Sequence, residues 1–233
     1  MKIAVYGCNF GNYRDELKNG IDNIYFDETI DYYFFTDNKK LTSTNWKIIV
    51  FPLLNLEKTK DIMNSFRLTS KYVKFILPDI LKSYDIIIWY DNKLLKNNPL
   101  KFNRDDIEKL FDGNNYKLIN YKHPHRKTPQ EELSITINFH IENKNNGMIF
   151  LEKIKNNKYN TILVDTCFIV RKNDNETNSL FENIFKLLIL EGLKRDQNVY
   201  NHAIDIFNYP IDNICYIDLI QKDNYTNFIK LDS

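Results

Sequence analysis

The chain has 233 residues, of which 43% are hydrophobic, including 15 Tyr and 16 Phe. This length and apolar content predict one packed globular domain and exclude an intrinsically disordered chain. Lysine and arginine number 32 against 31 aspartates and glutamates, so the formal net charge is +1. This balance offers no cationic footprint for a phosphate backbone, and we therefore expect no nucleic-acid partner.

Three apolar stretches near the amino terminus are predicted strands, and each runs into a polar loop: residues 2–6, 31–36 and 46–51. The loop after the first strand contains Gly7 and Gly11, and glycine permits close approach of the backbone to a ligand. Such a loop suits contact with a nucleotide base or ribose, and it is equally compatible with a plain turn. The second strand ends at Asp37, in a similar loop.

A helix is predicted within residues 58–81, because apolar residues there recur mostly at helical spacing until Pro78 interrupts the pattern. Arg67, Lys71 and Lys74 follow one another at intervals of four and three, so they line one face of this helix. Such a face is able to bind a diphosphate. A solvated basic stripe without a ligand is the alternative.

Residues 84–93 contain the most informative strand, a run of isoleucines and aromatic residues that ends in Asp91. The absence of polar alternation predicts that the strand is buried on both faces. In open α/β sheets ligands bind outside the carboxyl ends of the strands, so Asp91 is placed to meet a nucleotide, a metal or a sugar. Alternatively, Asp91 caps a turn together with Asn92.

A strand predicted over residues 116–120 leads into a loop that holds His123, His125 and Arg126. Two imidazoles around a proline serve as metal ligands, as an acceptor-binding pair or as ordinary surface residues, and the sequence leaves these alternatives open. A pair of glutamates, Glu131 and Glu132, follows at the start of a helical stretch.

The remaining predicted elements are helices over residues 105–111, 133–157 (broken at Gly147) and 176–190, and strands over residues 163–171 and 214–219, before a polar tail. Asp165 lies inside the first of these strands. After the last of the helices, Asp196 and Gln197 stand at the start of one more helix, where the Asp196 carboxylate is well suited to be an N-cap.

Five short motifs within residues 2–207 resemble, in their order, a glycosyltransferase-like family long catalogued as a domain of unknown function. The core of the resemblance is a Lys-x-x-x-Pro helix end followed by a Trp-x-Asp strand end. The motifs are Val5-Tyr6-Gly7 through Phe10-Gly11-Asn12-Tyr13, Phe35-Thr36-Asp37-Asn38, Lys74 to Pro78 with Trp89-Tyr90-Asp91, His123-Pro124-x-Arg126 followed by Glu131, and Arg195-Asp196-Gln197.

The resemblance implies a GT-A glycosyltransferase, which is a single Rossmann-like α/β domain with a central mixed, mostly parallel sheet flanked by helices. In this family a nucleotide-sugar, here expected to be UDP-linked, lies over the carboxyl ends of the strands. An Asp-x-Asp motif holds a divalent cation, Mn²⁺ or Mg²⁺, on the diphosphate. The implied reaction is hexosyl transfer to a hydroxyl of a glycan or another acceptor.

By this resemblance the nucleotide-sugar is expected to contact Tyr6, Gly7, Asp37, Arg67, Lys71, Lys74, Asp91, Asn92 and Lys93. Asp91 is the expected metal ligand, but Lys93 stands where the motif usually has its second carboxylate. His123, His125 or Asp165 would then complete the ligand set, together with the diphosphate and water. Alternatively, Lys93 and the basic helix face neutralise the diphosphate without a metal.

The same resemblance places the sugar or the acceptor at His123, His125, Arg126, Glu131 and Asp165, and catalysis at Asp196 and Gln197. Asp196 would act as the base of an inverting reaction. The spacing of Asp196, Gln197 and Asn201 also resembles that of retaining glycogenin-like transferases, in which such residues hold the donor sugar. The stereochemistry of transfer therefore stays open.

Two other function classes compete with this interpretation. A binding module that keeps the fold without turnover is consistent with Lys93 at the place of a carboxylate. A nucleotidyltransferase ranks last, because the chain contains no glycine-rich phosphate loop followed by lysine.

Cys8, Cys167 and Cys215 are odd in number and have apolar neighbours, which favours buried free thiols and a reducing compartment. The apolar stretch at the amino terminus is too short for a signal peptide, and no window reaches membrane-spanning length. We therefore expect a cytoplasmic protein without an integral membrane segment, and the sequence does not indicate its oligomeric state.

Overall fold

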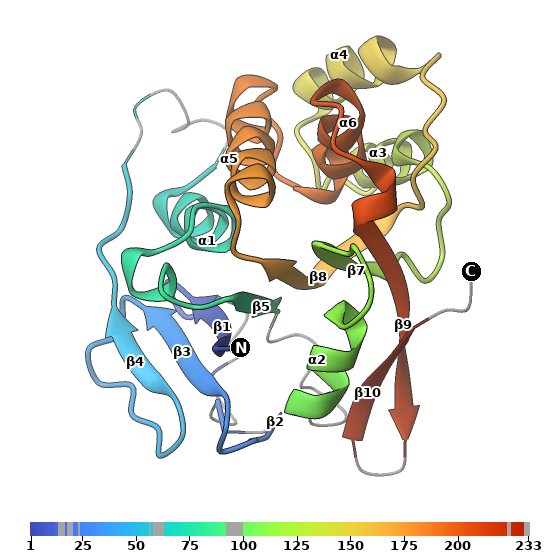
Figure 1. The fold of residues 1–233 in the computed structure, drawn as a ribbon. Coiled ribbons are helices and arrows are strands. Elements are labelled where there is room, and N and C mark those ends of the chain that lie inside the picture. The colour runs from blue at the N-terminus through green and yellow to red at the C-terminus, as the bar shows by residue number, and fades with distance from the viewer. Residues whose placement is uncertain are drawn as a thin grey trace.

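The computed structural model describes residues 1–13, 17, 21–22, 24–55, 57, 63–91, 100–222 and 225–230 (Figure 1). Asn92 and Lys93, which were expected to contact the nucleotide-sugar, lie outside the described residues, as do residues 58–62 of the predicted helix. The described part of the chain forms one ten-stranded sheet with helices on both faces.

The strands are β1 (Ile3–Asn9), β2 (Ile24–Tyr25), β3 (Asp31–Thr36), β4 (Lys47–Val50), β5 (Ile86–Tyr90), β6 (Leu100–Lys101), β7 (Leu118–Lys122), β8 (Val164–Lys172), β9 (Ile214–Lys222) and β10 (Tyr225–Lys230). Their order across the sheet is β2-β6-β10-β9-β7-β8-β5-β1-β3-β4. The neighbours pair in parallel, except for β5 with β8, β7 with β8 and β9 with β10. The expected α/β class with a mixed, mostly parallel sheet flanked by helices is therefore confirmed.

Strand β5 is buried on both faces, as its unbroken apolar sequence predicts. Because successive side chains point to opposite faces of a strand, Ile86, Ile88 and Tyr90 join the core on one side. Ile87 and Trp89 join the core on the other side. The flanking strands β1 and β8 cover both edges of β5, so it is a central strand of the sheet.

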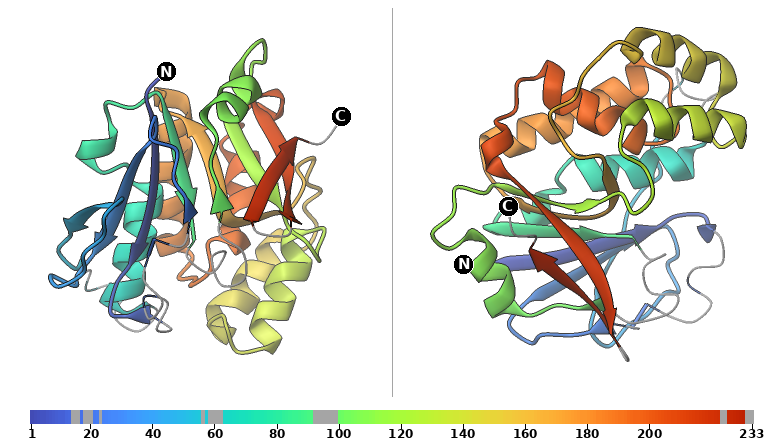
Figure 2. Two further views of the ribbon diagram at one scale, coloured as in Figure 1. Left: turned by 90° about the horizontal axis from the view of Figure 1, so that it is seen from below. Right: turned by 90° about the vertical axis from the view of Figure 1, so that its right-hand side faces the viewer.

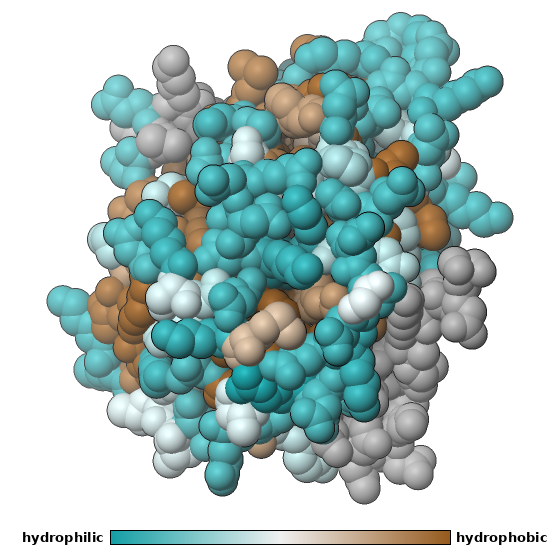
Figure 3. All heavy atoms as spheres, in the orientation of Figure 1, coloured by the Kyte–Doolittle hydropathy of each residue, from teal (hydrophilic) through white to brown (hydrophobic). Residues whose placement is uncertain are grey.

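The helices are α1 (Ser65–Phe75), α2 (Arg104–Phe111), α3 (Pro129–Asn138), α4 (Lys144–Ile154), α5 (Asn175–Leu190) and α6 (Gln197–Ile206). Figures 1 and 2 show α1 and α3 to α6 on one side of the sheet and α2 on the other. No helix within the described ranges is long and apolar enough to cross a membrane. Hydrophilic residues cover most of the face seen in Figure 3, with hydrophobic residues in smaller, separate patches.

The expected helix over residues 133–157 is in fact two helices, and the break lies at residues 139–143. His140 has a left-handed backbone there (φ 56°), and the Asn143 side chain caps the start of α4. Gly147, where we expected the break, lies inside α4. A Cβ at this position would come within 2.7 Å of Ile137, so the glycine permits close packing of α3 on α4.

Two further predictions about where strands end were wrong. Strand β1 continues to Asn9, so Gly7 is a strand residue paired with Phe34 and does not belong to a loop. The expected polar tail contains β10, which pairs antiparallel with β9. A sheet edge supplies backbone partners to any adjacent extended segment, whether or not its sequence is apolar.

Candidate active site

A pocket of about 320 Å³ lies at the edge of the sheet where β1 and β5 end. Its walls come from β1 and the loop after it, from α1, from the adjoining ends of β5 and β8, and from the loop that leads into α6. This volume is within the range of small-molecule sites, and the place is where open α/β sheets bind their ligands.

Asp91 and Asp165 line the same pocket although one follows β5 and the other belongs to β8. The antiparallel pairing of these strands places the amino end of β8 next to the carboxyl end of β5. The backbone N–H of Asp91 donates to the carbonyl oxygen of Cys167 at 2.8 Å, which fixes this alignment. The internal aspartate of a strand thus becomes a pocket residue.

The basic face of α1 lines the same pocket with Arg67, Lys71 and Lys74. The carboxyl end of this helix is anchored to the sheet. The Tyr6 hydroxyl donates to the carbonyl oxygen of Lys74 at 2.7 Å, and the fully buried Arg171 guanidinium donates to that of Phe75 at 3.4 Å. A cation at the last carbonyls of a helix also complements its dipole.

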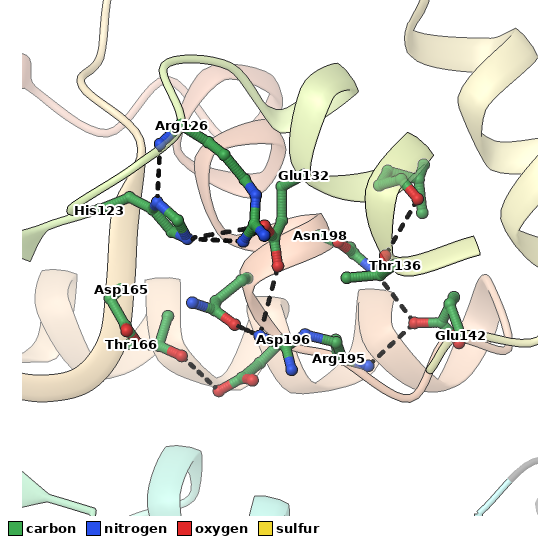
Figure 4. Close-up of polar contacts among 12 residues, drawn as sticks. His123, Arg126, Glu132, Thr136, Glu142, Asp165, Thr166, Arg195, Asp196 and Asn198 are labelled. Carbon is green, nitrogen blue, oxygen red and sulfur yellow. Dashed lines mark hydrogen bonds and ion pairs between the residues drawn. The ribbon is translucent and has the colours of Figure 1, made fainter. Parts of the chain in front are cut away.

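Asp196 connects the α6 loop to this basic face. The Lys71 Nζ atom lies 2.6 Å from Asp196 Oδ1, and Lys74 Nζ forms an ion pair with Oδ2. The Thr166 hydroxyl donates to Oδ2 at 3.0 Å (Figure 4). Asp196 takes the N-cap position of α6, as predicted, but its side chain makes no capping hydrogen bond, so the predicted capping role of the carboxylate is wrong.

Burial and charge act against each other in this cluster. Burial raises the pKa of the Asp196 carboxyl, but the ammonium groups of Lys71 and Lys74 hold that pKa well below its usual range. Burial lowers the pKa of Lys74, and Asp196 opposes this effect. The ion pair is therefore what keeps two charged groups inside the protein. Burial also raises the pKa of Cys8, which lines the pocket, to about 12.

The loop after β7 does not line the pocket but contacts it indirectly, through Glu132 and Arg195. The buried Glu132 accepts from Arg126 Nη1 at 2.6 Å and forms a second ion pair with Arg195 Nη2 at 3.3 Å (Figure 4). His123 Nε2 lies 3.6 Å from the same carboxylate, and burial lowers the pKa of this imidazole. Arg195, which does line the pocket, donates to the side chain of Gln197.

Glu131, expected at the acceptor, has a different place from Glu132. Its carboxylate accepts from the backbone of Lys127 at 2.8 Å and completes a capping box with Thr128 at the start of α3. It is exposed and is not among the residues that line the pocket.

Glu142 holds the α6 loop in place, and the sequence analysis missed it. This buried carboxylate accepts from the backbone N–H of Lys194 at 2.8 Å and from that of Arg195 at 3.0 Å. It also accepts from the Asn198 side chain at 3.0 Å and from the backbone of Asn143 at 2.8 Å. A lone glutamate in a polar turn carries no sequence signal for such a role.

The loop after β1 forms the remaining wall. The Asn9 side chain links the two ends of this loop: it accepts from the Tyr13 backbone N–H at 3.0 Å and donates to the Tyr13 carbonyl at 3.2 Å. Asp37 accepts from the Gly11 N–H at 3.0 Å, so this side chain shapes the loop without lining the pocket. Gly11 has a φ of +64°, and a Cβ there would meet the Phe66 ring at 2.7 Å.

The pocket brings together seven of the residues that the sequence analysis singled out: Arg67, Lys71, Lys74, Asp91, Asp165, Asp196 and Gln197. Seven further residues with an expected site role do not line it: Tyr6, Gly7, Asp37, His123, His125, Arg126 and Glu131. Asn201 also points elsewhere, because its side chain donates to Thr161 and to the Ile162 carbonyl. Thr166 joins the site without having been predicted.

A hard divalent cation is commonly held by one or two carboxylates together with substrate phosphates and water. Asp91 and Asp165 provide two carboxylates in one pocket, which fits that ligand set. Within the described ranges no group of three or more His, Cys, Asp and Glu side chains is arranged to hold a metal ion. The remaining ligands would have to come from the bound substrate and from water.

No protein-family model matches the chain, and no curated protein matches it in sequence. Among solved structures, the chain is similar to the galactosyltransferase LgtC, which was solved in complex with donor and acceptor sugar analogues. The TM-score is 0.47 at 9% sequence identity, and the similarity covers 93% of this chain and 73% of that chain.

Proposed function

We propose that the chain is a GT-A-type glycosyltransferase, acting as one domain, that moves a hexosyl group from a UDP-sugar to a hydroxyl of a glycan or another acceptor. The observation that carries this proposal is the composition of the pocket. Three basic residues on one face of α1 meet three carboxylates from other elements at the carboxyl end of β5. A ligand that carries both a diphosphate and sugar hydroxyls matches this combination of side chains.

The basic residues of the pocket serve the leaving group. Transfer breaks the bond between the anomeric carbon and the diphosphate oxygen, and negative charge develops on that oxygen. Arg67, Lys71 and Lys74 line the pocket and can stabilise this charge there, where such interactions are stronger than in open water. A divalent cation bound by Asp91 would supply additional stabilisation of the same charge.

The carboxylates of the pocket serve the sugar and the acceptor. Carboxylate oxygens accept hydrogen bonds from sugar hydroxyls, and Asp165 and the Gln197 amide line the same pocket as Asp91. An acceptor hydroxyl must also lose a proton, and a carboxylate within hydrogen-bond reach is the usual general base. We assign Asp165 and Gln197 to the sugar and the acceptor.

The first test is a thermal-shift screen of nucleotide-sugars with and without Mn²⁺, followed by a search for released nucleotide diphosphate. A ligand at about 100 times its Kd stabilises the folded state by about 2.7 kcal/mol, which raises the Tm by roughly 5–10 °C for a chain of this size. We expect one UDP-sugar to give such a shift and to release UDP when an acceptor is present. If no nucleotide-sugar shifts the Tm, the proposal is wrong.

Asp91→Ala tests the role of the site. We expect this variant to lose transfer and donor hydrolysis while its Tm without ligand stays near that of the wild type. Asp79→Ala is the matched control, because this exposed carboxylate only pairs with Lys82 on the surface. An Asp91→Ala protein with a wild-type rate would remove Asp91 from the mechanism.

The alternative is a binding module that holds a nucleotide-sugar without turning it over. The ion pairing of Asp196 favours this alternative, because it engages one of the three carboxylates of the pocket with lysines. It predicts a thermal shift with a nucleotide-sugar and no release of nucleotide diphosphate with any acceptor.

A further inference from the structure

The Asp196 carboxylate is almost completely enclosed, with 4% of the residue exposed. We propose that Asp196 is a positioning residue: it is the fixed counter-ion that holds Lys71 and Lys74 in place for an incoming diphosphate, and it is not the catalytic base. This inference rests on the proposed function for the identity of the ligand. The ion-pair geometry supports it independently of any turnover.

The donors around Asp196 leave little room for a base. A carboxylate has about four lone-pair positions. Lys71 occupies one on Oδ1, and Lys74 and Thr166 occupy two on Oδ2. The pKa of this carboxyl, which the two ammonium groups hold well below its usual range, also makes it a weak proton acceptor at neutral pH.

The two lysines need this partner for a physical reason. The side chain of Lys74 is 4% exposed and that of Lys71 is 19% exposed. A buried ammonium group without a counter-ion is strongly unfavourable, and two of them side by side also repel each other. Asp196 offsets both costs, because each of its oxygens takes one lysine.

The same pairing leaves the lysines able to bind a ligand. An ammonium group has three N–H donors, and each lysine donates one to Asp196. Both lysines line the pocket, so phosphate oxygens can accept from the donors that remain. The two lysines and Asp196 together carry a net charge of +1, which favours a polyvalent anion without leaving two unpaired charges behind when it dissociates.

The test compares the wild type with Asp196→Asn, using inorganic pyrophosphate as the probe. Asparagine is isosteric but removes the counter-ion, so we expect the Tm without ligand to fall by roughly 10 °C. Pyrophosphate replaces the missing negative charge, so it should raise the Tm of the variant by more than it raises that of the wild type. If Asp196 acted only as a catalytic base or as a sugar ligand, Asp196→Asn would change neither the Tm without ligand nor the Tm shift caused by pyrophosphate.

A second variant keeps the test decisive if Asp196→Asn does not fold. In Asp196→Asn/Lys74→Met the buried ammonium group is removed together with its counter-ion, and a methionine of similar length fills the space. We expect this double variant to recover most of the lost Tm, because the more deeply buried ammonium group is no longer left without its counter-ion. A double variant as unstable as the single one, or a single variant with the wild-type Tm, would overturn the proposal.

The outcomes also separate this inference from the proposed function. Pyrophosphate binding and Tm require no sugar transfer. If the Tm pattern holds and no nucleotide-sugar is turned over, the counter-ion role stands and the glycosyltransferase assignment falls. If transfer is found but Asp196→Asn keeps the wild-type Tm and pyrophosphate response, the assignment stands and the counter-ion role falls.

Discussion

Replacing Glu142 by glutamine tests whether a single buried carboxylate holds the loop before α6. Its Oε1 accepts from the backbone of Asn143 and Lys194, and its Oε2 accepts from Arg195 and Asn198. In Glu142→Gln one oxygen becomes an NH₂ group, which then faces two N–H donors. Each buried donor left unpaired costs about 1–3 kcal/mol. With some relaxation, we expect the free energy of unfolding to fall by about 3 kcal/mol.

The assay is equilibrium unfolding in urea, in which a loss of stability lowers the transition midpoint without changing the m-value. Glu131→Gln is the control, because Glu131 lies in the same region but is exposed and completes a capping box. Glutamine serves equally well in that motif, so the control should lose no more than about 0.5 kcal/mol. A loss in Glu142→Gln as small as that in Glu131→Gln would refute the role that we assign to Glu142.

Three further predictions use other features of the structure. Gly11→Ala should destabilise the protein more than Gly113→Ala in the same urea assay, because both have a positive φ but only the first places a Cβ against Phe66; equal losses would contradict this. Burial lowers the pKa of His202, so the unfolded chain binds more protons below about pH 6.5 and stability should fall on acidification, by at most about 1.4 kcal/mol per pH unit. His202→Gln should flatten that slope, and an unchanged slope would exclude His202 as its source. Native protein should react slowly with iodoacetamide, since none of the three cysteines forms a disulfide but burial raises the pKa of Cys8 to about 12 and the other two are buried; mass spectrometry should count three labelled cysteines only after denaturation.

Local sequence patterns were enough to predict much of the sheet and part of the site. The alternation-free run before Asp91 identified β5, and the stretch at residues 31–36 matches β3. The spacing of Arg67, Lys71 and Lys74 placed these residues on one helix face, and they line one pocket. Such features depend on the periods of a strand and a helix, which the order of neighbouring residues sets.

The tertiary structure alone decided how these parts meet. Asp165 becomes a neighbour of Asp91 only because β8 runs antiparallel to β5. Asp196 has the spacing of a helix cap, yet its carboxylate pairs with Lys74, a residue 122 positions away. Glu142 likewise accepts from the backbone of Lys194 and Arg195, which lie at least 52 residues away in the sequence. Contacts of this range depend on the order and direction of strands, and a buried charge takes the partner that the fold brings within reach, because leaving it unpaired costs more than any local hydrogen bond returns.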